Sequence, residues 1–326
     1  MRAGLLAVPL LLVAWAGYGD EVADSPPRPA AQAPLAAQAL LNDVARAGTR
    51  WVAVGGWGNI VLSDDEGVSW RQASAVPARR TLASVYFADA EHGWAVGHDA
   101  LVLHSADGGE HWEIQYRDLD ADAPLLSVWF RDAQRGLAVG GFGQLVETRD
   151  GGRSWQGRRL GPEGEEPHLN HVFPGPDGML FIAAEFGAAF RSRDDGATWE
   201  ALRLPYEGSL WYGLSLPSTR RVLMFGMRGH VFRSEDLGES WLPVETGSDQ
   251  SLQAATRLRD GRVVAVGLGG TVLTSRDGGL RFEPSVRSDR SGLAAVAEAS
   301  DGELLLFGEK GTRRGLAAER APAAGP

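Results

Sequence analysis

Cysteine is absent from the 326 residues, and lysine occurs once, as Lys310. The lack of cysteine excludes disulfides, thiolate metal sites and cysteine nucleophiles. The formal net charge is −10, from 32 Lys plus Arg against 42 Asp plus Glu. This balance argues against nonspecific nucleic-acid binding, which depends on a basic surface. Nearly all positive charge is arginine, which we interpret as a compositional bias of the source genome; arginine-based docking to a partner is the alternative.

No apolar run reaches the roughly 20 residues that a membrane-spanning helix needs. The run from Ala3 to Ala16 follows Arg2 and ends in the small-x-small sequence Ala14-Trp15-Ala16. A positive start, a short apolar stretch and such a site are typical of a secretory signal peptide. We predict a signal peptide over residues 1–19, an exported periplasmic protein and no integral membrane segment after cleavage. A retained N-terminal anchor is the alternative.

One motif recurs at a constant period, which is the strongest signal in the sequence. It reads Ser or Thr, any residue, Asp, any residue, Gly, any residue, Ser or Thr, and Trp. Near-complete copies occupy residues 63–70, 105–112, 148–155, 192–199 and 234–241, with a degenerate copy at 275–282. Their terminal aromatic residues are 42, 43, 44, 42 and 41 residues apart. Repeats of this length are typical of propellers and solenoids.

The chemistry of this Asp-box motif is structural. An Asp carboxylate can accept hydrogen bonds from backbone amides of its own turn, and Gly supplies a positive φ. The aromatic residue then begins a strand and buries a large surface between neighbouring units. We therefore predict turn-stabilising and packing roles, not catalysis, for Asp65, Trp70, Asp107, Trp112, Asp150, Trp155, Asp194, Trp199, Asp236, Trp241, Asp277 and Phe282.

Three further strands precede most boxes. Seven hairpin signals such as Val54-Gly55-Gly56-Trp57-Gly58 lie between short apolar runs. Seven upstream runs begin near Leu41, Leu82, Leu125, Leu169, Leu210, Leu252 and Leu293. Four strands in about 42 residues make a propeller blade. We predict an all-β fold, a seven-bladed β-propeller of four-stranded blades over residues 40–318, and a disordered tail over 319–326. The strands of each blade are A, the innermost, to D.

The seventh unit has no Asp box and no D strand, which would leave a bare sheet edge. A Pro/Ala-rich segment covers residues 20–39. We predict that residues 28–37 pair as the outer strand of blade seven and close the ring. A disordered linker is the alternative.

Asp boxes that follow such hairpins resemble one propeller family. Gly55 through Trp70, Gly97 through Trp112, Gly140 through Trp155 and their later counterparts resemble the photosystem II stability and assembly factor family. The resemblance covers about residues 40–312, and the family includes relatives in non-photosynthetic bacteria, to which we expect this chain to belong. It implies a non-catalytic propeller that, in phototrophs, binds early photosystem II assembly intermediates on the lumenal side.

The same resemblance implies docking through a basic arginine patch. Candidate pairs in this chain are residues 79–80, 158–159, 220–221 and 313–314. They fall at differing points of their blades, and nothing in the sequence shows that they converge.

Asp boxes also occur in sialidases and other glycoside hydrolases, so an exported hydrolase is the alternative function. A sialidase-like site needs three arginines, a Tyr–Glu pair and an acid, and a glycosidase generally needs two carboxylates about 5–10 Å apart. Carboxylates do cluster in the D–A loops at residues 118–122 and 163–166, and Tyr206 precedes Glu207. We interpret these loops as a solvated face.

Metal and cofactor sites have no convincing signature. Asp118, Asp120 and Asp122 have the spacing of a calcium loop, but Gly at position six and Glu at position twelve are missing, and Trp129 stands at the latter. His168 and His171 do not have metal-ligand spacing, and we expect surface or packing roles for them. We predict no catalytic residue, no metal and no cofactor.

The B–C turns carry Trp57, Phe142 and Phe186 at equivalent places. Exposed aromatic residues on one face would make a partner-docking rim, with Arg228 and Lys310 as charged neighbours. The alternative is that these aromatic residues pack between blades. The family resemblance implies that the chain binds a membrane-protein complex and aids its assembly or stability, in the periplasm, or in the lumen of a phototroph. The rim, if exposed, is the predicted contact surface.

Overall fold

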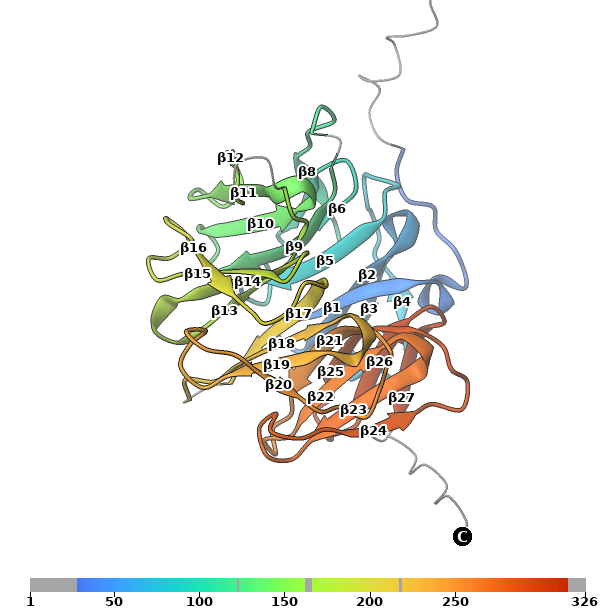
Figure 1. Ribbon diagram of the computed structural model, residues 1–326. Helices are drawn as coiled ribbons and strands as arrows, with labels where there is room; N and C mark the ends of the chain where they lie inside the picture. The colour runs from blue at the N-terminus through green and yellow to red at the C-terminus, as the bar shows by residue number, and fades with distance from the viewer. Residues whose placement is uncertain (1–27, 122, 162–165, 217–218, 316–326) are drawn as a thin grey trace, which may run out of the picture.

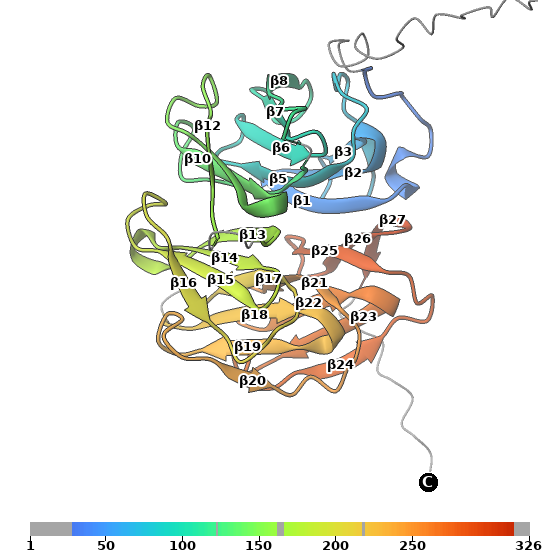
Figure 2. The same ribbon diagram turned by 45° about the horizontal axis from the view of Figure 1, so that its top comes forward.

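The computed structural model describes residues 28–121, 123–161, 166–216 and 219–315. Seven antiparallel sheets surround a central axis, as Figures 1 and 2 show. Neighbouring A strands contact one another all the way round, and β1 contacts β25 to close the ring. The predicted seven-bladed propeller is thereby confirmed. The predicted signal peptide and C-terminal tail lie outside the described residues.

The first four blades comprise β1 (Leu41–Ala47), β2 (Arg50–Gly55), β3 (Ile60–Ser63) and β4 (Arg71–Gln72); β5 (Leu82–Phe87), β6 (Gly93–Gly97), β7 (Leu101–Ser105) and β8 (Glu113–Tyr116); β9 (Leu125–Phe130), β10 (Gly136–Gly140), β11 (Gln144–Thr148) and β12 (Gln156–Arg159); β13 (Leu169–Pro174), β14 (Leu180–Ala184), β15 (Ala188–Ser192) and β16 (Glu200–Arg203).

The last three comprise β17 (Leu210–Ser215), β18 (Val222–Gly226), β19 (Val231–Ser234) and β20 (Leu242–Val244); β21 (Leu252–Arg257), β22 (Val263–Gly267), β23 (Thr271–Ser275) and β24 (Glu283–Val286); and β25 (Leu293–Glu298), β26 (Leu304–Gly308) and β27 (Gly311–Gly315).

Every A strand contains a register shift two residues after its first leucine, for example between Leu82 and Ser84. The shift brings the backbone before the strand against the end of strand B. A Cβ added at Gly97 would lie 2.1 Å from the carbonyl oxygen of Thr81, and one at Gly140 would lie 2.1 Å from that of Pro124. A close backbone approach therefore explains the glycine of the hairpin signal. Blade four has Ala184 at the equivalent position.

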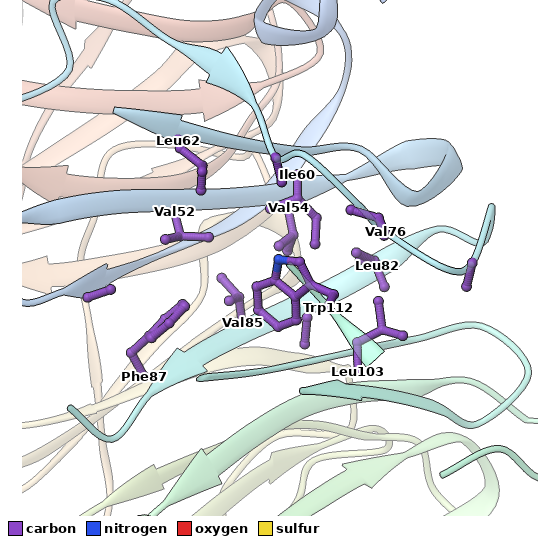
Figure 3. Packing of buried hydrophobic residues seen from close by; sticks show 14 of the residues in the cluster. Val52, Val54, Ile60, Leu62, Val76, Leu82, Val85, Phe87, Leu103 and Trp112 are labelled. Carbon is purple, nitrogen blue, oxygen red and sulfur yellow. The ribbon is translucent and has the colours of Figure 1, made fainter. Parts of the chain in front are cut away.

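Apolar side chains from adjacent blades form the core. Figure 3 shows the interface of the first two blades, where Trp112 of blade two lies in one buried cluster with Val52, Val54 and Leu62 of blade one. Each Asp-box aromatic residue in blades one to six contacts the preceding blade in the same way. Blades are thus held by their neighbours, as in other repeat proteins.

Side-chain donors reinforce these interfaces at the Asp-box turns. Arg50 donates to the carbonyl of Gly108 at 3.3 Å, and Gln115 donates to that of Gly151 at 3.1 Å. Arg191, which is almost fully buried, donates to Leu237 at 2.6 Å and pairs with Glu200 and Glu239. In each of the three bonds to a backbone carbonyl, the donor comes from one blade and the acceptor from the Asp-box turn of the next. Many arginines are therefore part of the scaffold.

The N-terminal segment does not form the predicted outer strand of blade seven. That sheet has three strands in the described chain. The amide of Ala30 instead donates to the carbonyl of Val76 at 3.0 Å, and the side-chain amide of Gln32 donates to Ala73 at 2.8 Å. The segment, blue in Figure 1, therefore follows blade one, because the Ala30 amide and the Gln32 side chain both bond to that blade.

A short 3-10 helix, η1 (Ala36–Gln38), ends this segment at the seam between the last and first blades. Ala36 packs with Trp51 of blade one and with Leu305 and Phe307 of blade seven. The carbonyl of Ala36 accepts a 2.7 Å hydrogen bond from Asn59. The segment therefore bridges the seam without adding a strand.

Candidate functional site

The B–C turns all emerge on the face opposite the Asp boxes. In four blades the turn is a 3-10 helix: η2 (Gly56–Gly58), η3 (Gly141–Gly143), η5 (Met227–Gly229) and η6 (Leu268–Gly270). The central residue of each has a left-handed backbone, with φ of 60° at Trp57, 53° at Phe142, 52° at Arg228 and 62° at Gly269. The turn itself therefore directs the side chains of Trp57, Phe142 and Arg228 outward.

The three aromatic residues at this turn position are exposed. Phe186 occupies it in blade four, with φ of 56°. The relative exposure is 74% for Trp57, 43% for Phe142 and 72% for Phe186. They do not pack between blades, and we call these three residues the aromatic rim. Left-handed backbone is costly for a bulky side chain, so the fold tolerates strain to hold apolar groups in water.

Polar groups surround the rim. The guanidinium of Arg79 lies over the Trp57 ring at 5.5 Å, and Phe142 meets His168 edge-on at 4.9 Å. Arg228 borders a groove of about 850 Å³ between blades five and six, which His230, Thr246, Gln250 and Arg290 also line. This face offers aromatic, cationic and hydrogen-bonding groups together.

Lys310 differs from the other predicted rim residues. Blade seven has a two-residue turn, in which Gly308 pairs directly with Gly311. Lys310 is exposed, but its backbone is outside the left-handed region that the other turns share. It lies one blade away from Trp57 on the same face.

The arginine pairs do not gather into one patch. Arg221 donates to the carbonyl of Gly278 at 2.7 Å, on the Asp-box side. Arg159 instead donates to the carbonyl of Phe142 at 2.6 Å, on the opposite side. Arg80 pairs with Asp99 at 2.6 Å. Their places at different blades and faces explain why no single basic surface results.

The Asp-box carboxylates are held by their own turns. In the first box, Asp65 accepts from the Ser69 amide at 2.9 Å and from the Ser63 hydroxyl at 2.8 Å. Hydrogen bonding, first of all from the Ser69 hydroxyl, lowers the pKa of Asp65 to about 2. Such a carboxylate stays ionised and committed to its turn, so it is unsuited to general acid chemistry.

The D–A loops do not assemble a hydrolytic site in the described residues. Tyr206 packs on Phe232 at 5.0 Å between ring centroids, whereas Glu207 is exposed. Asp118 accepts hydrogen bonds from the amides of Asp120 and Ala121, both at 3.1 Å. Residues 122 and 163–165 lie outside the described chain. Among the residues that are described, no group of three His, Asp or Glu could hold a metal ion.

A cavity of about 390 Å³ lies in the central channel. Of the residues that line it, Asp43 is the one with a carboxylate. Burial raises the pKa of Asp43 to about 6, although the Val85 amide donates to it at 2.9 Å and the Ser84 hydroxyl at 2.8 Å. A lone carboxylate falls short of the pair that glycoside hydrolysis generally requires.

Asp43 belongs to a set of contacts that sequence reasoning missed. In blades one, three and four the residue after the A-strand register shift accepts a hydrogen bond from the next blade. Ser127 accepts from the Val172 amide at 3.2 Å, and the Nδ1 atom of His171 accepts from the Gly213 amide at 3.2 Å. Because burial lowers the pKa of His171 to about 3, that ring is neutral. In the sequence, these acceptors could have been found only by their position, which is two residues after the leucine that begins each A strand.

Comparison with known proteins bears on this arrangement. The family model described as Photosynthesis system II assembly factor YCF48 matches residues 72–125 and 115–314. The chain belongs to this family. The predicted family resemblance is thereby confirmed, and the YCF48 family is one of non-catalytic binding propellers.

Solved structures share the fold of this YCF48-family chain. YCF48 bound to D1 peptide superposes with a TM-score of 0.71 at 19% identity, covering 90% of this chain and 100% of that one. YCF48 from Cyanidioschyzon merolae gives 0.67 at 15%, covering 86% and 97%. Streptogramin B lyase, an enzyme, gives 0.71 at 12%, covering 86% and 94%. No curated protein matches the sequence. Identities this low establish the fold alone.

Proposed function

We propose that this chain is an exported scaffold that binds a membrane-protein complex through the aromatic rim and aids its assembly or stability. One observation carries the proposal: Trp57, Phe142 and Phe186 are held outward on one face, in backbone conformations that disfavour them. Exposed aromatic side chains are the residues that most often dominate binding energy at protein interfaces. Strain of this kind concentrates at functional positions.

Family membership supports a protein partner. The relative YCF48 was solved with a D1 peptide bound, so a propeller of this family can bind a polypeptide. The partner proposed here is a membrane-protein complex in general, and a photosynthetic one where the host is a phototroph.

Export is part of the proposal. It is supported by the signal-peptide pattern of residues 1–19. No helix in the described ranges is long and apolar enough to cross a membrane. The N-terminal sequence of the protein isolated from its own host would decide between cleavage and a retained anchor: a mature end near residue 17–20 supports cleavage, and an intact Met1 supports the anchor.

Affinity capture tests the partner directly. The tagged full-length chain would be crosslinked lightly in its own host and recovered from solubilised membranes. A membrane-protein complex should be enriched with the wild type and depleted with Trp57→Ala/Phe142→Ala. Val68→Ala is the matched control, because Val68 is an apolar residue 67% exposed in an Asp box on the other face.

Equal recovery with the rim variant and the wild type would sink the proposal. Loss with the Val68 variant but not with the rim variant would assign docking to the Asp-box face instead. Thermal unfolding of each variant would show that the fold is intact.

A further inference from the structure

The outer edge of blade seven differs from every other blade. Strand β27 pairs with β26, and no strand lies on its other side in the described residues. In the other six blades a D strand occupies that place, for example β24 beside β23. Figure 2 shows β27 at the outside of the last blade. Helix η1 of the N-terminal segment contacts β27, with Ala37 beside Gly311 at the start of the strand, but the segment adds no strand along this edge.

Two prolines show which backbone groups of β27 point outward. Pro243 lies opposite Phe232, and Pro284 lies opposite Leu273. Proline has no N–H and cannot form the paired hydrogen bonds of an antiparallel ladder. The backbone groups of Phe232 and Leu273 therefore point to strand B, and those of the residues on either side of them point to strand D. Arg313 is the equivalent of Leu273 in blade seven, because Leu273 lies opposite Ala265 of strand B and Arg313 lies opposite Leu306 at the same position of strand B. By this equivalence Thr312 and Arg314 direct their amides and carbonyls to the open edge. The Thr312 carbonyl accepts a 2.9 Å hydrogen bond from the Arg313 guanidinium, which an incoming strand would displace.

Arg313 stands where other blades place a buried apolar residue. The equivalent C-strand residues are Val61, Leu103, Val146, Phe190, Phe232 and Leu273, all of them buried. Arg313 pairs across the sheet with Leu306, which packs against Val264 and Val266 of blade six. Its side chain is therefore on the blade-six face of the sheet. It is exposed, and no carboxylate of the described residues forms an ion pair with it.

The interface beside Arg313 also lacks the aromatic residue that blades one to six provide. The cluster between blades six and seven is built from aliphatic residues such as Val264, Leu304 and Leu306. The corresponding clusters elsewhere contain a Trp or Phe of an Asp box, as Trp112 between blades one and two. In blade seven, the outer strand and the Asp-box aromatic residue that would precede it are both missing from the described residues, on the side of the blade that faces blade six.

We propose that the outer edge of β27 accepts an acidic, extended segment of a partner protein as the fourth strand of blade seven. Strand addition to an exposed edge supplies affinity through main-chain hydrogen bonds, and side-chain pockets supply specificity. The cationic Arg313 favours a carboxylate on the incoming strand. Two copies of this chain do not fit, because antiparallel pairing of β27 with itself would bring arginines together.

A synthetic peptide that copies residues 105–116 with Ile114→Glu (SADGGEHWEEQY) is the probe for this site. It is the outer strand of blade two with its Asp box. Ile114 lies opposite Leu103, the equivalent of Arg313, so the substitution places a carboxylate opposite Arg313. We expect saturable binding to the full chain in calorimetry, with slower hydrogen exchange at the Thr312 and Arg314 amides. A peptide with the carboxylates changed to amides should bind at least tenfold more weakly.

Matched protein variants locate the binding. Arg313→Glu should weaken binding of the acidic peptide at least tenfold, and Thr312→Pro should abolish it by removing an outward donor. Arg276→Glu makes the same change of charge at an exposed Asp-box residue of blade six and should bind as the wild type does. Circular dichroism melts would confirm that each variant is folded.

Three outcomes would overturn the proposal. One is the absence of saturable peptide binding, and another is equal binding by Arg313→Glu and the wild type. The third is slow exchange at Thr312 and Arg314 in the free chain that becomes fast when residues 316–326 are deleted, because that segment would then occupy the edge itself. None of these outcomes bears on the aromatic rim.

Discussion

The rim residues occupy a backbone conformation that suits glycine better than a bulky side chain. Blade six demonstrates the alternative, because Gly269 holds the same turn position with φ of 62°. Placing a non-glycine residue there costs roughly 1–2 kcal/mol. The packing of the blade gains nothing in return at Phe186, which is 72% exposed. A binding role accounts for a side chain that the fold does not need.

Phe186→Gly should therefore leave the fold at least as stable as the wild type. We expect the free energy of unfolding to rise by roughly 0.5–1 kcal/mol, the relief of strain less the added entropy of glycine. Urea unfolding would measure it. A loss of more than 1 kcal/mol would show that Phe186 is a packing residue, contrary to the account.

Asp43 is a second residue in an unfavourable environment, because its carboxyl group is buried. Its carboxylate joins blades one and two through Ser84 and Val85, yet it lies in the channel without an ion-pair partner among the described residues. Burial raises its pKa to about 6. An acid whose folded pKa is raised stabilises the fold when protonated and loses that stabilisation as pH rises through the folded value.

Stability should thus fall between about pH 4 and pH 7 more steeply in the wild type than in Asp43→Ser. Serine is the residue at the equivalent place in blades two and three, as Ser84 and Ser127. The shift of about two pKa units corresponds to about 2–3 kcal/mol between the two proteins. Urea unfolding at pH 4 and pH 7.5 measures this difference, and parallel pH profiles would refute the raised pKa.

At the scale of one element, the Asp box combines a turn with an interblade contact. The turn places Trp112, which is 6% exposed, against the preceding blade. Trp112 also meets Phe87 of its own blade edge-on. Its indole donates to the carbonyl of Gly109 at 2.8 Å. The motif thus links local backbone geometry to the stability of the ring.

Trp112→Ala should destabilise the protein by about 3–5 kcal/mol, the usual loss for a buried aromatic residue. Trp57→Ala is the matched control, because Trp57 is the same residue type on the surface, and its effect should stay within about 0.5 kcal/mol. Denaturant unfolding compares them. Similar losses in both variants would contradict the assignment of one tryptophan to the core and the other to the rim.

Sequence reasoning succeeded where the structure depends on local chemistry. An Asp, a Gly and a hydroxyl within eight residues define each turn, and the strands beginning at Leu82 or Leu169 were visible in the apolar pattern. It failed for the segment at residues 28–37, whose hydrogen-bond partners lie about 40 positions away, as Gln32 and Ala73 do. No local pattern distinguishes pairing with blade one from pairing with blade seven.

The candidate site could be predicted only in part, because its geometry also depends on contacts between residues far apart in the sequence. The shared turn position of Trp57, Phe142 and Phe186 was visible, but their exposure depends on how the turn directs them. The arginine-rich composition indicated neither the blade contacts of Arg191 nor the dispersal of the pairs, because a long side chain can reach the next blade. Such contacts become visible only once the ring is closed.

For the whole molecule, the two faces of the propeller have different properties. The Asp-box face is crossed by ion pairs such as Arg71–Glu110 and by donors to neighbouring turns. The opposite face holds the aromatic rim and the groove beside Arg228. Because each blade contacts only its neighbours, turn residues on one face can vary without disturbing the core. The ring thus presents two chemically different faces, and we propose that the face with the aromatic rim binds the partner.

Site-specific photo-crosslinking tests that claim most directly. A photoreactive phenylalanine analogue would replace Phe186 on the rim in one variant and Val68 in an Asp box in the other, and each full-length chain would be irradiated in its own host. The account predicts a discrete crosslink to a membrane-protein subunit from position 186 and none from position 68. A crosslink from position 68 alone, or the same products from both, would contradict it.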